Sequence, residues 1–206
     1  MTATSRADGA SAPPSRDGSS IWKPFLLRAA GAAVFGLLTI FWQDPSVHVL
    51  SIAGGAYLLV LGAGLAWTAR STRASGTRGT AAALAGGLLA AAGLADLVVH
   101  DEHLFAATAG VALAAAGAVE LATGARLRRT RPAGNDLILV GAVSVLTAVA
   151  LPFVVPLGAH ALLGVAGGGA LLTAVVLGIA ALSYRQDAGR PGSGEAGAHP
   201  AGNAVN

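Results

Sequence analysis

Cysteine is absent from this 206-residue chain, and charged side chains are scarce. Without cysteine the protein has no disulfide and no thiolate metal site, so the sequence leaves its redox compartment open. Only 11% of the residues are charged and 54% are hydrophobic. The mean hydropathy of +0.65 is high for a soluble domain.

The sequence signatures of soluble enzymes are also missing. The chain contains neither a phosphate-binding GxxxxGK[ST] loop nor an HExxH zinc motif, and its glycines lie in apolar runs. We therefore expect no enzyme activity, no catalytic residues, no metal and no cofactor. The isoelectric point of about 10.2 raises nucleic acid as a partner. No nucleic-acid-binding motif accompanies it, so we expect none.

Apolar runs of about 20 residues dominate the rest of the chain. As a helix, such a run spans the hydrocarbon layer of about 30 Å and satisfies its own backbone hydrogen bonds. The sequence predicts an all-α integral membrane protein with six transmembrane helices, at about Pro24–Trp42, Val47–Ala69, Thr80–Val99, His103–Thr123, Asp136–Val155 and Ala159–Tyr184. Polar tails at 1–20 and 186–206 flank this domain of residues 24–185, and we predict both tails to be disordered.

Apart from Arg28, near the start of the first run, basic residues fall only in the tails and in alternate breaks between the apolar runs. They lie in the two tails and their flanks, in the break at 70–79 and in the break at 124–135, whereas the turns at 43–46, 100–103 and 152–160 have none. We predict a multi-pass protein of the bacterial inner membrane, and the positive-inside rule places both of its termini in the cytoplasm. The high isoelectric point is then a topology signal, and the lipid bilayer is the predicted partner.

A short motif recurs at the head of every second apolar run. HVLSIAGG begins at His48, HLFAATAG at His103 and HALLGVAG at His160, spaced by 55 and then 57 residues. This spacing predicts three tandem two-helix repeats, at about 24–73, 80–129 and 136–185.

Glycines inside the runs let helix backbones approach in lipid, where the hydrophobic effect does not drive association. We expect contacts of this kind, within the monomer rather than in a possible homo-oligomer, at Gly54, Gly55, Gly62, Gly110, Gly117, Gly164 and Gly168.

Residues 28–73, RAAGAAVFGLLTIFWQDPSVHVLSIAGGAYLLVLGAGLAWTARSTR, resemble the repeat of the HdeD-like bacterial membrane proteins. The cues are a helix ending near Trp42, then Asp44-Pro45, then a glycine-punctuated helix closed by arginine. The resemblance covers about residues 24–185 and weakens in the later pairs, where HDEH and LPFVVP replace the Asp-Pro turn. It implies six helices built from two-helix repeats and a role in acid resistance, and it supplies no catalytic residues.

The histidines at the repeat heads admit three interpretations. His48, His103 and His160 would form an acid-sensing cluster if the hairpins converge, because histidine titrates near pH 6.5. Neutral imidazoles would alternatively form a three-histidine metal site. In the third interpretation, duplication copied one interfacial histidine with no further role. Asp96 and His100, four residues apart and so on one helix face, are further candidates for a pH response or a proton relay.

Two more charged residues fall inside apolar runs. Arg28 and Glu120 both lie near the predicted cytoplasmic ends of their helices, and we predict an ion pair that ties two repeats together. Asp136 is the predicted N-cap of the fifth helix. The sequence favours a non-enzymatic protein of acid or general stress tolerance, with a small transporter or channel as the alternative.

Overall fold

The computed structural model describes residues 18–71, 76–129 and 133–189, and every regular element in these ranges is helical. The predicted all-α fold is thereby confirmed. The elements are α1 (Gly18–Phe41), α2 (Val47–Ser71), α3 (Thr77–Val98), α4 (Glu102–Leu127), α5 (Ala133–Val154), the single 3₁₀ turn η1 (Val155–Leu157) and α6 (Gly158–Gly189). Most of both predicted tails, at 1–17 and 190–206, lies outside the described residues.

The first and last helices are longer than the apolar runs that predict them. Helix α1 begins at Gly18, not at Pro24, and α6 continues past Tyr184 to Gly189. Once a helix is nucleated, each added residue gains a hydrogen bond at small cost, so a helix can continue beyond its apolar segment. The two helices therefore overlap the predicted tails at residues 18–20 and 186–189, and the disorder of both tails stays a prediction.

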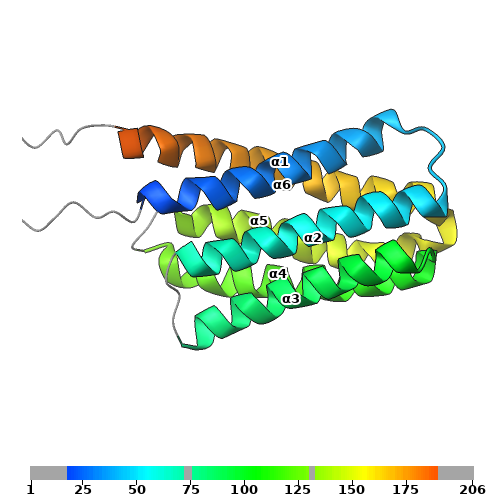
Figure 1. Cartoon of the computed structure of the whole chain (residues 1–206), viewed down its shortest axis with the longest axis horizontal. Helices are drawn as coiled ribbons and strands as arrows, with labels where there is room; N and C mark the ends of the chain where they lie inside the picture. Colours follow the sequence, from blue (N-terminus) through cyan, green and yellow to red (C-terminus); the bar gives the residue numbers. More distant parts are fainter. Residues whose placement is uncertain (1–17, 72–75, 130–132, 190–206) are drawn as a thin grey trace, which may run out of the picture.

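By length and hydropathy, five helical stretches of the described residues can cross a membrane, one fewer than the sequence predicts. Four of these stretches belong to α1, α2, α3 and α4. The fifth, Ala133–Gln186, is 54 residues long because α5, η1 and α6 follow one another without a polar loop. Gly158 has a φ of 82°, a left-handed conformation that suits glycine, at the point where α5 and α6 turn back alongside each other (Figure 1).

The helices lie lengthwise in an elongated bundle (Figure 1). Helices α2, α4 and α6 contact one another in all three combinations, whereas the described parts of α1, α3 and α5 make no backbone approach to one another. The most extensive helix contacts join α2 to α3, α4 to α5 and α6 to α1. The predicted hairpins α1–α2, α3–α4 and α5–α6 pack less extensively than these pairs.

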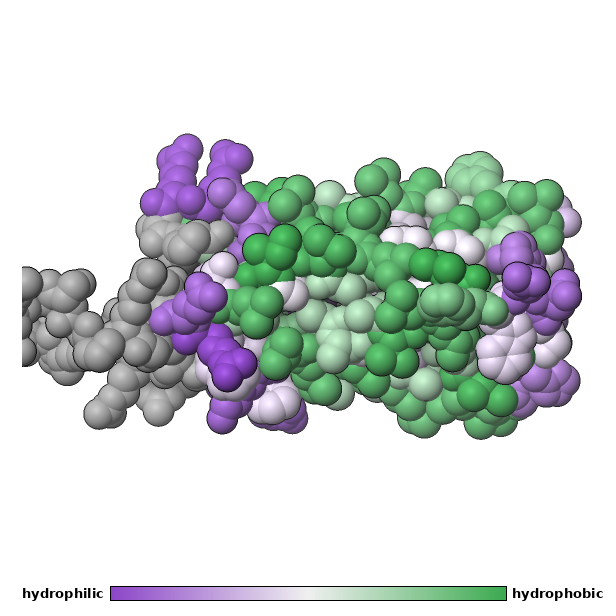
Figure 2. Space-filling model, turned by 90° about the horizontal axis from the view of Figure 1, so that it is seen from above, coloured by the Kyte–Doolittle hydropathy of each residue, from purple (hydrophilic) through white to green (hydrophobic). Residues whose placement is uncertain are grey.

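The two ends of the bundle are polar and its middle is apolar (Figure 2). One end, here called the basic end, carries the exposed or partly exposed side chains Lys23, Arg70, Arg78, Arg126, Arg128, Arg129 and Arg185. The other, the histidine end, carries Asp44, His48, His100, Asp101, Glu102, His103 and His160. Between them, large apolar side chains such as Val34, Leu146 and Ile179 are more than 60% exposed. Such a continuous apolar surface is suited to lipid.

Glycine pairs bring the backbones of α2 and α3 together. A methyl group on Gly62 would lie 2.6 Å from the carbonyl oxygen of Gly86, and one on Gly55 would lie 2.7 Å from that of Gly93. Neither distance leaves room for a side chain, so close contact depends on glycine here.

The same arrangement recurs between α4 and α5. A methyl group on Gly117 would lie 2.7 Å from the carbonyl oxygen of Gly141. The prediction was wrong for Gly164 and Gly168, which face open space. Helix α6 instead makes its close contacts at Gly167 and Gly169, which lie next to threonine side chains of α1 and α5.

Candidate functional site

Two histidine rings stack at the histidine end. His48, in the first turn of α2, and His100, in the α3–α4 connection, have ring centroids 4.5 Å apart and planes inclined by 22°. His48 is exposed and His100 is partly buried. Two imidazole rings from different parts of the chain are therefore held face to face.

His103 and His160, the other two repeat histidines, do not take part in this stack. His160, in the first turn of α6, borders a pocket of about 420 Å³ formed with the 43–46 turn, which includes Asp44. His103 is exposed in the first turn of α4. Among the described residues no three histidine, aspartate or glutamate side chains are placed to hold a metal ion.

Acidic side chains at this end cap helices. Asp101 accepts a hydrogen bond from the backbone N–H of Leu104 at 2.7 Å, as an N-cap of α4. Glu102 Oε1 accepts one from the backbone N–H of Ala159 at 3.0 Å, in the first turn of α6. Both carboxylates also complement the positive ends of the helix dipoles. Their first role is therefore to fix the helix starts that carry His103 and His160.

Asp96 is fully buried near the histidine end of α3, and its partner is not His100. Helix α3 ends at Val98 and the next residue is extended, so the expected four-residue helical relation between Asp96 and His100 is broken. The Thr108 hydroxyl of α4 instead lies 2.8 Å from Asp96 Oδ1 and also 2.8 Å from the Leu104 carbonyl. The other carboxylate oxygen, Oδ2, has no partner in the described part of the chain.

Arg28 and Glu120, which the sequence pairs, form a salt bridge whose two side chains are 4% and 2% exposed. Their helices, α1 and α4, make no backbone contact. The arginine stem crosses the intervening α2 at Gly64, where a methyl group would collide with it. Because Gly64 has no side chain, the Arg28 side chain can pass α2 and reach Glu120. Within the described residues, Arg28 Nε and Nη1 and Glu120 Oε2 have no hydrogen-bond partner.

Three of these contacts lie beyond the sequence reasoning. The His48–His100 stack joins α2 to the α3–α4 connection, and the Thr108–Asp96 bond joins α4 to α3. No spacing along the chain encodes either contact. Asp136 is not the N-cap of α5, which begins at Ala133, and the Tyr184 hydroxyl donates to it at 2.6 Å.

Fold and surface place the protein in the class of helical bundles with an apolar, lipid-suited girdle and polar ends. Comparison with known proteins finds no matching family model, no matching curated protein and no matching solved structure.

Proposed function

We propose that the chain is a six-span, non-enzymatic protein of the bacterial inner membrane that takes part in acid or general stress tolerance. In this proposal the 54-residue stretch crosses the bilayer twice. A straight helix of that length would measure about 80 Å, far more than the hydrocarbon layer of about 30 Å. The turn at Gly158 supports two crossings.

The orientation that we propose places the basic end in the cytoplasm, in keeping with the positive-inside rule. The natural absence of cysteine makes this testable. Single cysteines at exposed Ser46 and exposed Thr77 would sit at opposite ends of the bundle. In intact cells an impermeant maleimide should label Ser46→Cys only, and labelling of Thr77→Cys alone would reverse the orientation.

The observation that carries the acid proposal is the stacked pair of His48 and His100. Histidine ordinarily titrates near pH 6.5, within the range that the exterior of a bacterium experiences. Protonation of both rings would place two positive charges 4.5 Å apart, measured between the ring centroids. Two such charges repel each other even in water. The α3–α4 connection would then separate from the start of α2. Nearby Asp44, Asp101 and Glu102 would counter part of that charge.

The resemblance of residues 28–73 to HdeD-like proteins supports the same proposal. The three repeat-head histidines are exposed at one end, where external pH would reach them in the proposed orientation. The proposal includes that the chain is built from three tandem two-helix repeats. The recurrence of glycine contacts at a spacing of 55 residues, Gly62 with Gly86 and Gly117 with Gly141, supports it.

The test is survival after acid shock in a strain without the protein, complemented at matched membrane levels. Wild type should rescue, and His48→Ala with His100→Ala should rescue poorly, because the pair is lost. His103→Ala, an exposed histidine at the same end, is the matched control and should rescue fully. Equal rescue by all variants would keep acid tolerance but remove the histidine pair from it. No defect in the deletion strain would refute the acid role.

A second candidate function is ion or proton transport, and the buried ionisable groups favour it. Asp96 and the Arg28–Glu120 pair are buried with unpartnered polar atoms among the described residues. Buried charge within a membrane bundle often marks an ion path. Proton flux into dye-loaded proteoliposomes, compared between wild type and Asp96→Asn, distinguishes this candidate from the first.

A further inference from the structure

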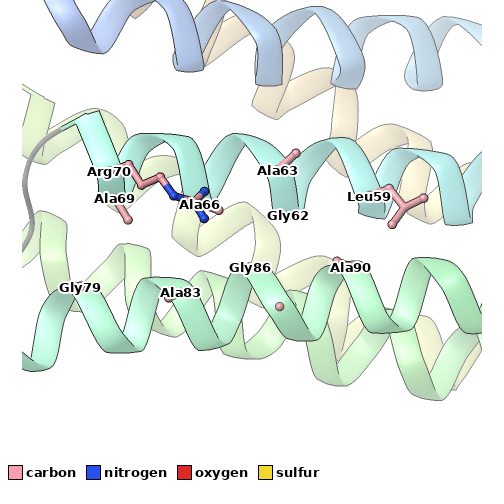
Figure 3. Close-up of a pocket in the computed structure, with 11 residues that line it drawn as sticks. Leu59, Gly62, Ala63, Ala66, Ala69, Arg70, Gly79, Ala83, Gly86 and Ala90 are labelled. Carbon is pink, nitrogen blue, oxygen red and sulfur yellow. The ribbon is translucent and has the colours of Figure 1, made fainter.

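A groove of about 790 Å³ runs between α2 and α3 on the side of the basic end (Figure 3). Its walls consist almost entirely of alanine and glycine, with Leu59 at one end and Arg70 at the other. Ala63, Ala83 and Gly87 in these walls are exposed, so the groove opens to the outside of the bundle. In a bilayer this opening faces lipid.

The matching interface of α4 and α5 shows why the groove exists. Backbones approach equally closely in the two places, since a methyl group on Gly62 would lie 2.6 Å from the Gly86 oxygen and one on Gly117 2.7 Å from the Gly141 oxygen. These two pairs are offset by 55 residues. The groove therefore does not come from a wider helix spacing.

The difference lies in the side chains next to those glycines. Between α4 and α5, Leu121 and Val145 fill the space, with side-chain carbons 2.9 Å and 2.8 Å from methyl groups built on the facing glycines. At the offset of 55 residues, Ala66 and Ala90 stand in their places between α2 and α3. Ile138 of α5 likewise corresponds to Ala83. Small side chains leave the groove unfilled.

An arginine lies in the mouth of this groove. The Arg70 side chain runs back along α2 toward Ala66, so its guanidinium lies over the groove (Figure 3). The offset of 55 residues puts Ala125 at the matching position of α4. Among the described residues no carboxylate is in salt-bridge distance of Arg70. The groove thus combines an apolar channel with a cation that has no described counter-charge.

We propose that the α2–α3 groove binds one anionic phospholipid, with an acyl chain along the alanine and glycine walls and the phosphate on Arg70. Guanidinium groups bind phosphate through paired N–H donors, and basic pockets between transmembrane helices bind anionic headgroups. A second copy of the chain fits less well, because a two-fold axis along this groove would bring Arg70 against Arg70. The proposal rests on the bilayer placement above and is independent of acid tolerance.

Native mass spectrometry of the detergent-purified protein provides the test, with phosphatidylglycerol and phosphatidylcholine of identical chains as the probes. Wild type should bind one phosphatidylglycerol in preference to phosphatidylcholine. Arg70→Gln should weaken phosphatidylglycerol binding about tenfold, equivalent to about 1.4 kcal/mol. Phosphatidylcholine binding should weaken less, because the choline cation already compensates the charge of its phosphate. Arg78→Gln removes an exposed charge at the same end, outside the groove lining, and should stay within about twofold of wild type.

A second variant fills the channel. Ala66→Leu with Ala83→Ile installs the side chains of the α4–α5 interface and should weaken binding of both lipids. If this variant misfolds, the comparison of Arg70→Gln with Arg78→Gln still decides, because both of those residues are exposed. Equal losses in the two arginine variants would overturn the proposal, since they would reflect overall charge alone. A dimer that dissociates when the groove is filled would also overturn it, in favour of a second copy.

The lipid-binding test and the acid-shock test can fail independently of each other. Survival of acid shock by the Arg70→Gln strain should match wild type if lipid binding and acid tolerance are independent. Loss of the lipid preference with intact survival therefore concerns the groove alone.

Discussion

Removing one partner of the buried Arg28–Glu120 pair should destabilise the bundle more than removing both. Both side chains are almost inaccessible, at 4% and 2% exposure. Arg28→Met leaves the Glu120 carboxylate without its counter-charge, and neither of its oxygens has a hydrogen-bond partner among the described residues. Glu120→Met leaves the guanidinium in the same position. The double variant removes both charges and keeps apolar volume.

The expected magnitudes follow from the cost of an uncompensated buried charge. Breaking a buried pair on one side costs about 3–5 kcal/mol, whereas replacing both members by apolar side chains is often neutral or stabilising. We therefore expect each single variant to lose about 3 kcal/mol of unfolding free energy and the double variant to lose less than about 1 kcal/mol. The resulting coupling energy would be well above that of an exposed pair.

Unfolding by sodium dodecyl sulfate in mixed micelles, followed by circular dichroism, measures these four free energies. Arg185→Met serves as a control, because Arg185 is an exposed arginine near Trp22 and its loss should change little. A charge exchange, Arg28→Glu with Glu120→Arg, should rescue only in part. The gap at Gly64 admits an arginine stem that comes from α1.

Additive losses in the double variant would refute the reasoning. They would mean that the two residues stabilise the fold separately, through their stems rather than through charge. Single variants as stable as wild type would contradict it as well, since they would imply that water reaches this site.

Four further outcomes are expected. Gly64→Ala should destabilise about as much as Arg28→Met in the same unfolding assay, because the new methyl group collides with the arginine stem, and an unchanged stability would contradict the crossing at Gly64. Gly164→Ala faces open space and should stabilise by about 0.5–1 kcal/mol, so a loss would show an unrecognised contact at that face. Thr108→Val should destabilise by about 1–3 kcal/mol, since it leaves Asp96 without its only described hydrogen-bond donor, and the effect should vanish in Asp96→Leu. The difference in thermal midpoint between wild type and His100→Ala should depend on pH under the proposed acid role of the stacked pair, and parallel curves for the two proteins would refute that role.

The helical architecture could be predicted from the sequence because it follows from the apolar composition of runs of about 20 residues. Each apolar run had to become a helix, and the buried ion pair of Arg28 and Glu120 followed from the cost of a lone charge at that depth. Helix ends were less accessible. The polar residues after Tyr184 extend α6, and the Pro152–Pro156 region continues as helix and 3₁₀ turn instead of a polar loop.

Other contacts between helices, such as the stack of His48 on His100, were out of reach because they depend on which helix faces meet. The common spacing of His48, His103 and His160 left open whether these histidines converge, and in the bundle His48 stacks on His100, which lies beyond the end of α3. The Gly164-Gly168 motif faces open space for the same reason. Spacing along a chain records shared ancestry or shared helix position, and only the packed bundle decides contact.

Under the proposed repeat, the positions that break the pattern are the more informative ones. Glu120 corresponds to Leu65 in the preceding pair and to Leu177 in the following pair, and both leucines are buried. Asp96 corresponds to buried Leu151. In each case one copy carries an acid where another packs an apolar core. At these positions the other copies pack a buried leucine, so helix packing alone does not require an acid there. The two carboxylates and the unfilled α2–α3 groove therefore join the His48–His100 stack as the places where a function of this chain would lie.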